Sequence, residues 1–219
     1  MKLHKETVSE LLLSSLQKLM EEEAFSQFRL VGGTALALQL GHRVSIDIDL
    51  FTDMEYGSMD TNKIANALLK NFNYIEGLQN LKNRELGYTL YCGEDQNHCI
   101  KIDLFYTDRF ILPALIIENI RMANLQEIAA MKILAIENSN RKKDYWDIHE
   151  LMEHLSLEKM IELGEERHPY EINRNNVINK LKHIPNDIDN TPILCLKGKY
   201  WEFIVEDIEE AAANITNTQ

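Results

Sequence analysis

The stretch RLVGGTALALQLGHRVSIDIDLF, residues 29–51, places two glycines after a short apolar segment and two aspartates inside a later alternating one. FRLVGG predicts a short strand that stops at glycine, and TALALQLGH predicts a helix that begins near Thr34 and ends at Gly41. RVSIDIDLFT alternates apolar and polar residues, which predicts a strand with Asp47 and Asp49 on one face, about 6–7 Å apart. Two like charges this close disfavour folding unless a cation lies between them.

The carboxylates and the glycines each suggest a ligand. Carboxylate oxygens at this spacing suit Mg²⁺ or Mn²⁺. Asp103 lies in a second alternating segment, HCIKIDLFY, and if that strand pairs beside residues 44–51, three carboxylates converge as in a two-metal phosphoryl-transfer site. Gly32 and Gly33 precede a helix, where backbone amides can bind phosphate. The alternatives are a solvated polar face on an edge strand and a tight strand-to-helix turn.

The rest of the chain predicts an α+β fold, with helices packed on a small mixed sheet. Residues 5–24 and DTNKIANALLKNF have helical spacing, whereas ELGYTLYCG and HCIKIDLFY predict a hairpin. The strand over RVSIDIDLFT should carry Val44, Ile46, Ile48 and Leu50 on the face opposite the aspartates. From about residue 111 the pattern is mostly helical, so we expect an α/β domain over 1–110 and a helical domain over 111–219.

Composition limits the classes of function. No apolar run approaches the roughly 18 residues of a membrane span, and the N-terminus reads as an amphipathic helix, so we expect a cytoplasmic protein without a membrane partner. The net charge of −12 argues against a broad DNA-binding surface but allows a small ligand or one nucleic-acid end. Cys92, Cys99 and Cys195 show no CxxC spacing, so we expect buried free thiols, although the first two could face each other across the hairpin.

With these residues in place, LVGGTALALQLGHRVSIDIDLF resembles the front motif of the AbiEii-like nucleotidyltransferase toxins, within the DNA polymerase beta-like superfamily. The superfamily pattern is a glycine-led turn, a helix, a strand with DxD and a third aspartate on a neighbouring strand. The resemblance continues through the lysine of EIAAMKILAI to RKKDYWDIHEL and covers roughly residues 28–152. The matching positions are Gly32, Gly33, Thr34, Arg43, Ser45, Asp47, Asp49, Asp103, Lys132 and Asp144.

The resemblance implies roles for these residues. Asp47, Asp49 and Asp103 would bind Mg²⁺ or Mn²⁺, and Asp103 would also orient or deprotonate the acceptor hydroxyl. The amides at 32–34 and the Thr34 hydroxyl would hold the β- and γ-phosphates, while Ser45 belongs to the same nucleotide-binding motif. Arg43 and Lys132 would offset phosphate charge, although Arg43 could instead be a helix-end cation and Lys132 a snorkelling or paired residue. Asp144 and Asp147 are both candidates for the site, Asp144 slightly ahead.

The resemblance also implies a function. The expected reaction moves a nucleotide from an NTP to a hydroxyl acceptor, either a tRNA 3′ end or a protein. The chain would be the toxin of a bacterial toxin–antitoxin or phage-defence pair, with an antitoxin protein as its partner. The helical region would complete the site and bind the acceptor or the partner. Two alternatives are a non-catalytic nucleotide- or partner-binding module and another two-metal enzyme, such as a phosphodiesterase or nuclease.

Overall fold

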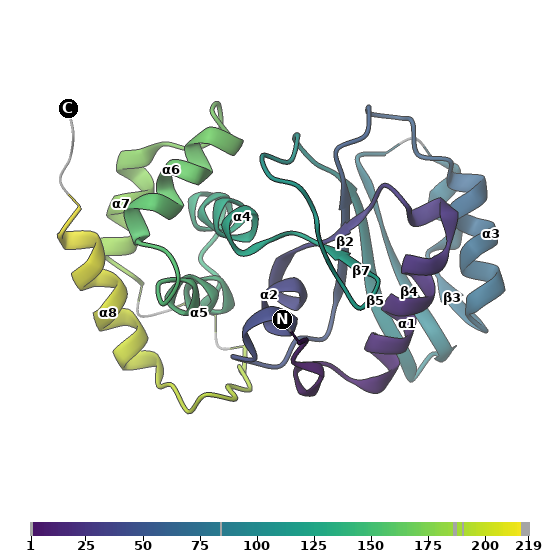
Figure 1. Cartoon of the computed structure of the whole chain (residues 1–219), viewed down its shortest axis with the longest axis horizontal. Helices are drawn as coiled ribbons and strands as arrows, with labels where there is room; N and C mark the ends of the chain where they lie inside the picture. The colour runs from purple at the N-terminus through teal and green to yellow at the C-terminus, as the bar shows by residue number, and fades with distance from the viewer. Residues whose placement is uncertain (1, 84, 186–187, 190, 216–219) are drawn as a thin grey trace. The chain divides into compact units, whose positions relative to one another are not determined.

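The computed structural model describes residues 2–83, 85–185, 188–189 and 191–215. The chain forms two compact units, Met1–Ala123 and Asn124–Gln219, each with its own core (Figure 1). The first contains the sheet and the second is helical, which confirms the expected α+β class. Within the described ranges, every helix is too short or too polar to span a membrane.

A mixed sheet is the centre of the first unit (Figure 1). Its order is β3-β4-β5-β2-β1-β7-β6. The β2–β5 and β1–β7 pairs are parallel and the other pairs are antiparallel. The strands are β1 (Arg29–Leu30), β2 (Ile48–Thr52), β3 (Tyr74–Glu76), β4 (Gly87–Asp95), β5 (His98–Tyr106), β6 (Leu115–Ile117) and β7 (Ile120–Met122).

Alternation along the central strands separates a buried face from a half-open one. Leu50, Leu90 and Ile102 are wholly buried, whereas Asp49 and Asp103, on the opposite face, are partly exposed. The helices of this unit are α1 (Glu10–Glu21), α2 (Gly32–Leu40) and α3 (Thr61–Asn71), and α1 contacts both α3 and β5. Burying the apolar face therefore leaves the carboxylates on the face that a ligand can reach.

The hairpin is confirmed, and so is the helix expected from Thr34, although α2 begins two residues earlier, at Gly32. Gly41 ends α2 in a left-handed conformation with φ of 69°. The strand expected over residues 43–52 is only partly correct. It begins at Ile48, and Ile46 is 73% exposed, because the preceding segment is held by other bonds, such as Ser45 N–H to the Thr7 carbonyl at 2.8 Å. Asp47 therefore lies just before the strand.

Two further differences concern the ends of the first unit. The helix expected over residues 5–24 is divided into η1 (Lys5–Thr7), α1 and η2 (Glu23–Phe25), because Ser9 caps α1 by accepting from Leu12 N–H. The strands β6 and β7 were not predicted, since each has only three residues. They join the sheet through β1, so the first unit extends beyond residue 111.

The second unit contains the helices that the sequence predicted. They are α4 (Leu125–Asn138), α5 (Lys142–Leu151), α6 (Leu157–Arg167), α7 (Arg174–Lys182) and α8 (Trp201–Ala213). Helix α4 contacts α5, α6 and α7, so it is the element around which this unit packs (Figure 1). A buried ion pair, Arg167 Nε to Glu127 Oε1 at 2.5 Å, joins α6 to α4.

All three cysteines are free thiols, as expected, but Cys99 and Cys195 are only partly buried. Cys92 lies opposite Ile100 rather than Cys99 and is completely buried, and burial raises the pKa of its thiol to about 12. Because the thiolate is the reactive form, we predict that Cys92 resists a thiol-labelling reagent at pH 8 in the folded protein. Mass spectrometry should show label on the partly exposed Cys99 and Cys195 first, and on Cys92 only after unfolding. Equal labelling rates would contradict this prediction.

Candidate nucleotide-binding and metal site

Two of the predicted carboxylates lie side by side on the half-open face of the sheet. Strands β2 and β5 pair in parallel, and their register places Asp49 opposite Asp103. Neighbouring strands are about 4.8 Å apart, so these side chains are within reach of one cation. The expectation that the Asp103 strand pairs beside the Asp49 strand is confirmed.

Asp103 is held by two side chains that the sequence-based prediction did not include. Thr89 on β4 donates from its hydroxyl to Oδ1 at 2.7 Å, and Lys101 donates from its ammonium to Oδ2 at 2.5 Å. Burial alone would lower the pKa of Lys101, but the hydrogen bond and charge of Asp103 outweigh it, and the pKa is raised. The charges of Asp47 and Asp49 add to this rise, so all three carboxylates act on one ammonium.

Asp47 is positioned through its backbone. The buried Thr34 hydroxyl is hydrogen-bonded to the Asp47 carbonyl oxygen at 2.5 Å and to the Ser45 hydroxyl at 2.8 Å. Both hydroxyls are buried, with Thr34 at 1% and Ser45 at 8% exposure. These contacts tie the start of α2 to the segment before β2 and hold the backbone at Asp47.

The two glycines are the first residues of α2, and both lie against site residues. Gly32 has a φ of +66°, and a Cβ atom there would be 2.7 Å from Asp49 Oδ2. A Cβ on Gly33 would overlap the guanidinium of Arg43, which is itself buried. Helix N-termini present unpaired amides and a positive dipole end to anions, so a phosphate bound here would lie close to Asp49 and Arg43.

The donor set fits a divalent cation. Asp47, Asp49 and Asp103 offer hard carboxylate oxygens, the ligands that Mg²⁺ and Mn²⁺ prefer. The raised pKa of Lys101 shows that negative charge is concentrated at this point of the sheet. Such a cluster is stabilised by bound cations, and it lies beside a helix N-terminus, whose backbone amides can bind phosphate.

Replacing Gly32 by alanine tests this packing. The side chain would require an unfavourable left-handed backbone and would displace the Asp49 carboxylate, and a shift of about 1 Å can cost 10²-fold in rate. We predict that the nucleotide transfer implied by the family resemblance becomes about 10–100-fold slower, as measured with labelled NTP. Gly198→Ala is the matched control, because Gly198 has the same φ of +66° and open space around its Cβ position. Equal losses in both variants would assign the effect to backbone strain alone.

In the second unit, Lys132 lies in a buried ion cluster. Its ammonium is 2.7 Å from Asp144 Oδ1 and 2.6 Å from Asp147 Oδ2, and both aspartate side chains are completely buried. Arg141 Nε adds a contact of 2.7 Å to Asp144 Oδ2. The i,i+3 spacing on α5 puts both aspartates on the face toward α4, so Lys132 binds the two together. This cluster cross-links α4 and α5.

The predicted residues thus form two groups. The first unit brings together the glycines, Thr34, Arg43, Ser45 and the three predicted carboxylates. The second unit brings Lys132 together with Asp144. Lys101 was missed, although its position two residues before Asp103 in an alternating strand puts both side chains on one face.

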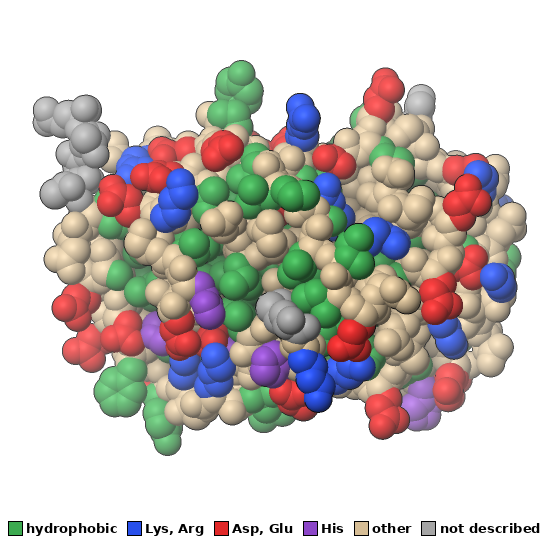
Figure 2. Space-filling view, viewed as in Figure 1, with side chains coloured by type: hydrophobic (Ala, Val, Ile, Leu, Met, Phe, Trp, Pro, Cys, Tyr) green, Lys and Arg blue, Asp and Glu red, His purple; other side chains and the backbone are tan. Residues whose placement is uncertain are grey.

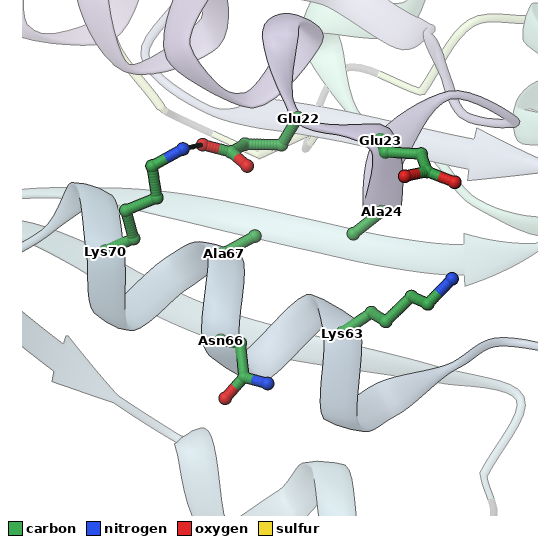
Figure 3. Close-up of a pocket in the computed structure, with 7 residues that line it drawn as sticks. All are labelled: Glu22, Glu23, Ala24, Lys63, Asn66, Ala67 and Lys70. Carbon is green, nitrogen blue, oxygen red and sulfur yellow. Dashed lines mark hydrogen bonds and ion pairs between the residues drawn. The ribbon is translucent and has the colours of Figure 1, made fainter.

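A hollow of about 240 Å³ lies elsewhere in the first unit, between η2 and α3 (Figure 3). Its lining mixes both signs of charge, and Lys70 forms an ion pair with Glu22 at 2.8 Å across it. None of its lining residues belongs to the carboxylate cluster. On the molecular face shown in Figure 2, acidic and basic side chains are interspersed.

Comparison with known proteins identifies a family whose model matches most of the chain. The model of the family described as "Nucleotidyl transferase AbiEii toxin, Type IV TA system" matches residues 14–214. No curated protein matches the chain. Similar solved structures include a candidate nucleotidyltransferase from H. pylori, with 17% identity, TM-score 0.58 and coverage of 96% of this chain and 92% of that one.

Two other solved structures are similar. JHP933 from Helicobacter pylori has 18% identity and a TM-score of 0.56, over 94% of this chain and 92% of that one. MenT4, a nucleotidyltransferase toxin from Mycobacterium tuberculosis H37Rv, has 13% identity and a TM-score of 0.58, over 94% of this chain and 84% of that one. At these identities the likeness establishes the fold.

Proposed function

Because the chain belongs to the nucleotidyl transferase AbiEii toxin family, and is therefore a nucleotidyltransferase, we propose that it is a Mg²⁺-dependent enzyme that transfers a nucleoside monophosphate from an NTP to a hydroxyl acceptor. The acceptor oxygen forms a bond to the α-phosphorus, the bond between the α-phosphorus and the bridging oxygen breaks, and pyrophosphate leaves. The observation that carries this proposal is the register of Asp49 opposite Asp103, beside the N-terminus of α2.

Asp47, Asp49 and Asp103 would hold the divalent cations. When bound, these ions offset the charge of the triphosphate and of the phosphorus under attack. Asp103 would orient the acceptor hydroxyl and accept its proton. The Lys101 ammonium donates a hydrogen bond to this carboxylate, so its position affects how readily Asp103 can accept the proton.

The start of α2 would bind the β- and γ-phosphates through its backbone amides. Glycine at positions 32 and 33 leaves the space that Asp49 and Arg43 occupy, and it allows an anion to approach the backbone. Arg43 would offset negative charge on the departing pyrophosphate. Thr34 and Ser45 would serve the nucleotide indirectly, by fixing Asp47. By the family resemblance, Lys132 would offset phosphate charge and Asp144 would contribute to the site.

The acceptor is proposed to be a tRNA 3′ end or a protein hydroxyl, and the chain is proposed to act as a toxin that a cognate antitoxin restrains. The family description supports the toxin role. The net charge of −12 favours an acceptor gripped at one end over a long nucleic acid bound along its backbone.

The test is incubation with each NTP labelled in its α-phosphate, together with Mg²⁺, total tRNA and cell extract. The Asp47→Ala/Asp49→Ala variant and a chelator serve as controls. Label transferred by the wild type alone would identify the base and the acceptor class. Label released as free nucleotide would instead favour a hydrolase. An absence of transfer with every NTP, although nucleotide binds, would overturn the proposed reaction.

A further inference from the structure

Lys101 occupies the position of a counter-ion at the carboxylate cluster. Its ammonium is 2.5 Å from Asp103 Oδ2, and the two side chains are 34% and 14% exposed. The other carboxylate oxygen accepts from Thr89 at 2.7 Å. Asp103 is thus oriented at both oxygens by groups from β4 and β5.

An ammonium in this place opposes the binding of a second cation. A charge within about 4–6 Å changes the pKa of a carboxylate by 1–3 units. A divalent ion bound at Oδ2 would be repelled by the Lys101 ammonium, which lies 2.5 Å from that oxygen. Both cations would also require the same oxygen atom.

We propose that Lys101 is an internal counter-ion, which fixes Asp103 in the metal-free protein and must leave Oδ2 before a divalent cation can use it. This inference rests on the proposed function, because it takes the three carboxylates as metal ligands. Lys101 is then a positioning residue that sets the metal affinity of the site. The triphosphate of an NTP offers the displaced ammonium a new anionic partner, so the metal at Asp103 is expected to enter with its nucleotide.

The experiment measures Mn²⁺ binding by calorimetry, without nucleotide, to the full chain. Lys101→Met should bind Mn²⁺ about tenfold more tightly than the wild type, by the scale of such charge effects. Lys101→Arg keeps the positive charge and should remain near the wild-type affinity. Lys70→Met is the matched control, because it also removes a lysine from an ion pair of the first unit, the one with Glu22 at 2.8 Å (Figure 3).

A double-mutant cycle assigns the effect to Asp103. In an Asp103→Asn background, Lys101→Met should change the Mn²⁺ affinity much less. If Lys101 is merely structural, Lys101→Met will lower the unfolding temperature and leave the Mn²⁺ affinity unchanged, and the inference is then overturned. Failure of the proposed metal site itself would look different, since Asp49→Asn would then leave wild-type Mn²⁺ binding intact.

Discussion

Asp49→Asn should lower the rate of nucleotide transfer by about 10³-fold, because metal-ion catalysis supplies several kcal/mol and each 1.36 kcal/mol is tenfold in rate. The variant should stay folded. Asparagine has nearly the shape of aspartate, so the pairing of β2 with β5 should persist. The amide lacks the negative charge and one acceptor oxygen. The site should therefore lose a carboxylate that lies opposite Asp103 and against Gly32. Label transfer at saturating NTP and Mg²⁺ measures the loss.

Asp95→Asn is the matched control for this variant. It makes the same chemical change in the first unit, at the end of β4, where Asp95 accepts from the backbone N–H groups of Asn97 and His98. We expect the control to keep its activity and both variants to keep the circular dichroism spectrum of the wild type. If Asp49→Asn transferred nucleotide as fast as Asp95→Asn, the carboxylate cluster would not be the catalytic centre.

Local patterns predicted most of the first unit. Alternation in residues 85–93 and 98–106 predicted the hairpin, and Gly41 predicted the end of α2. The pairing of β5 with β2 could not be predicted from local patterns, because strand order depends on contacts between distant segments. Strand β7, which pairs with β1, was not predicted because its three residues carry too little periodicity to indicate a strand.

The candidate site shows a similar division. Residue type and spacing selected Asp49 and Asp103 correctly as neighbours, because the pairing of β2 with β5 puts both on one face. Asp47 lies before β2, and its charge still acts on Lys101 beside them. The direction of the Thr34 hydroxyl was not predictable, since it depends on the path of residues 43–47 after they leave the sheet. Lys132 stood out as a cation on an apolar helix, but only the packing of α4 on α5 shows that both Asp144 and Asp147 bind it.

Lys132→Met should lower the free energy of unfolding by about 3–5 kcal/mol, the usual cost of removing one partner from a buried ion pair. Asp144 would keep Arg141 at 2.7 Å, whereas Asp147 would lose its contact of 2.6 Å with the ammonium. Denaturant unfolding followed by circular dichroism measures the change. Lys159→Met provides the comparison, because it breaks an exposed pair of the same unit, with Glu162 at 3.0 Å, and exposed pairs contribute about 0.2–1 kcal/mol.

Neutralising the aspartates separates the structural role of this cluster from a role in the reaction. The triple variant Lys132→Met/Asp144→Asn/Asp147→Asn buries no unpaired carboxylate, so it should recover much of the lost stability. If this stable variant transfers nucleotide more slowly than the wild type, the buried charges serve the reaction as well as the fold. If it transfers nucleotide at the wild-type rate, the cluster acts through the packing of α4 on α5 alone. A Lys132→Met variant no less stable than Lys159→Met would show that the buried ion pairs do not hold the second unit together.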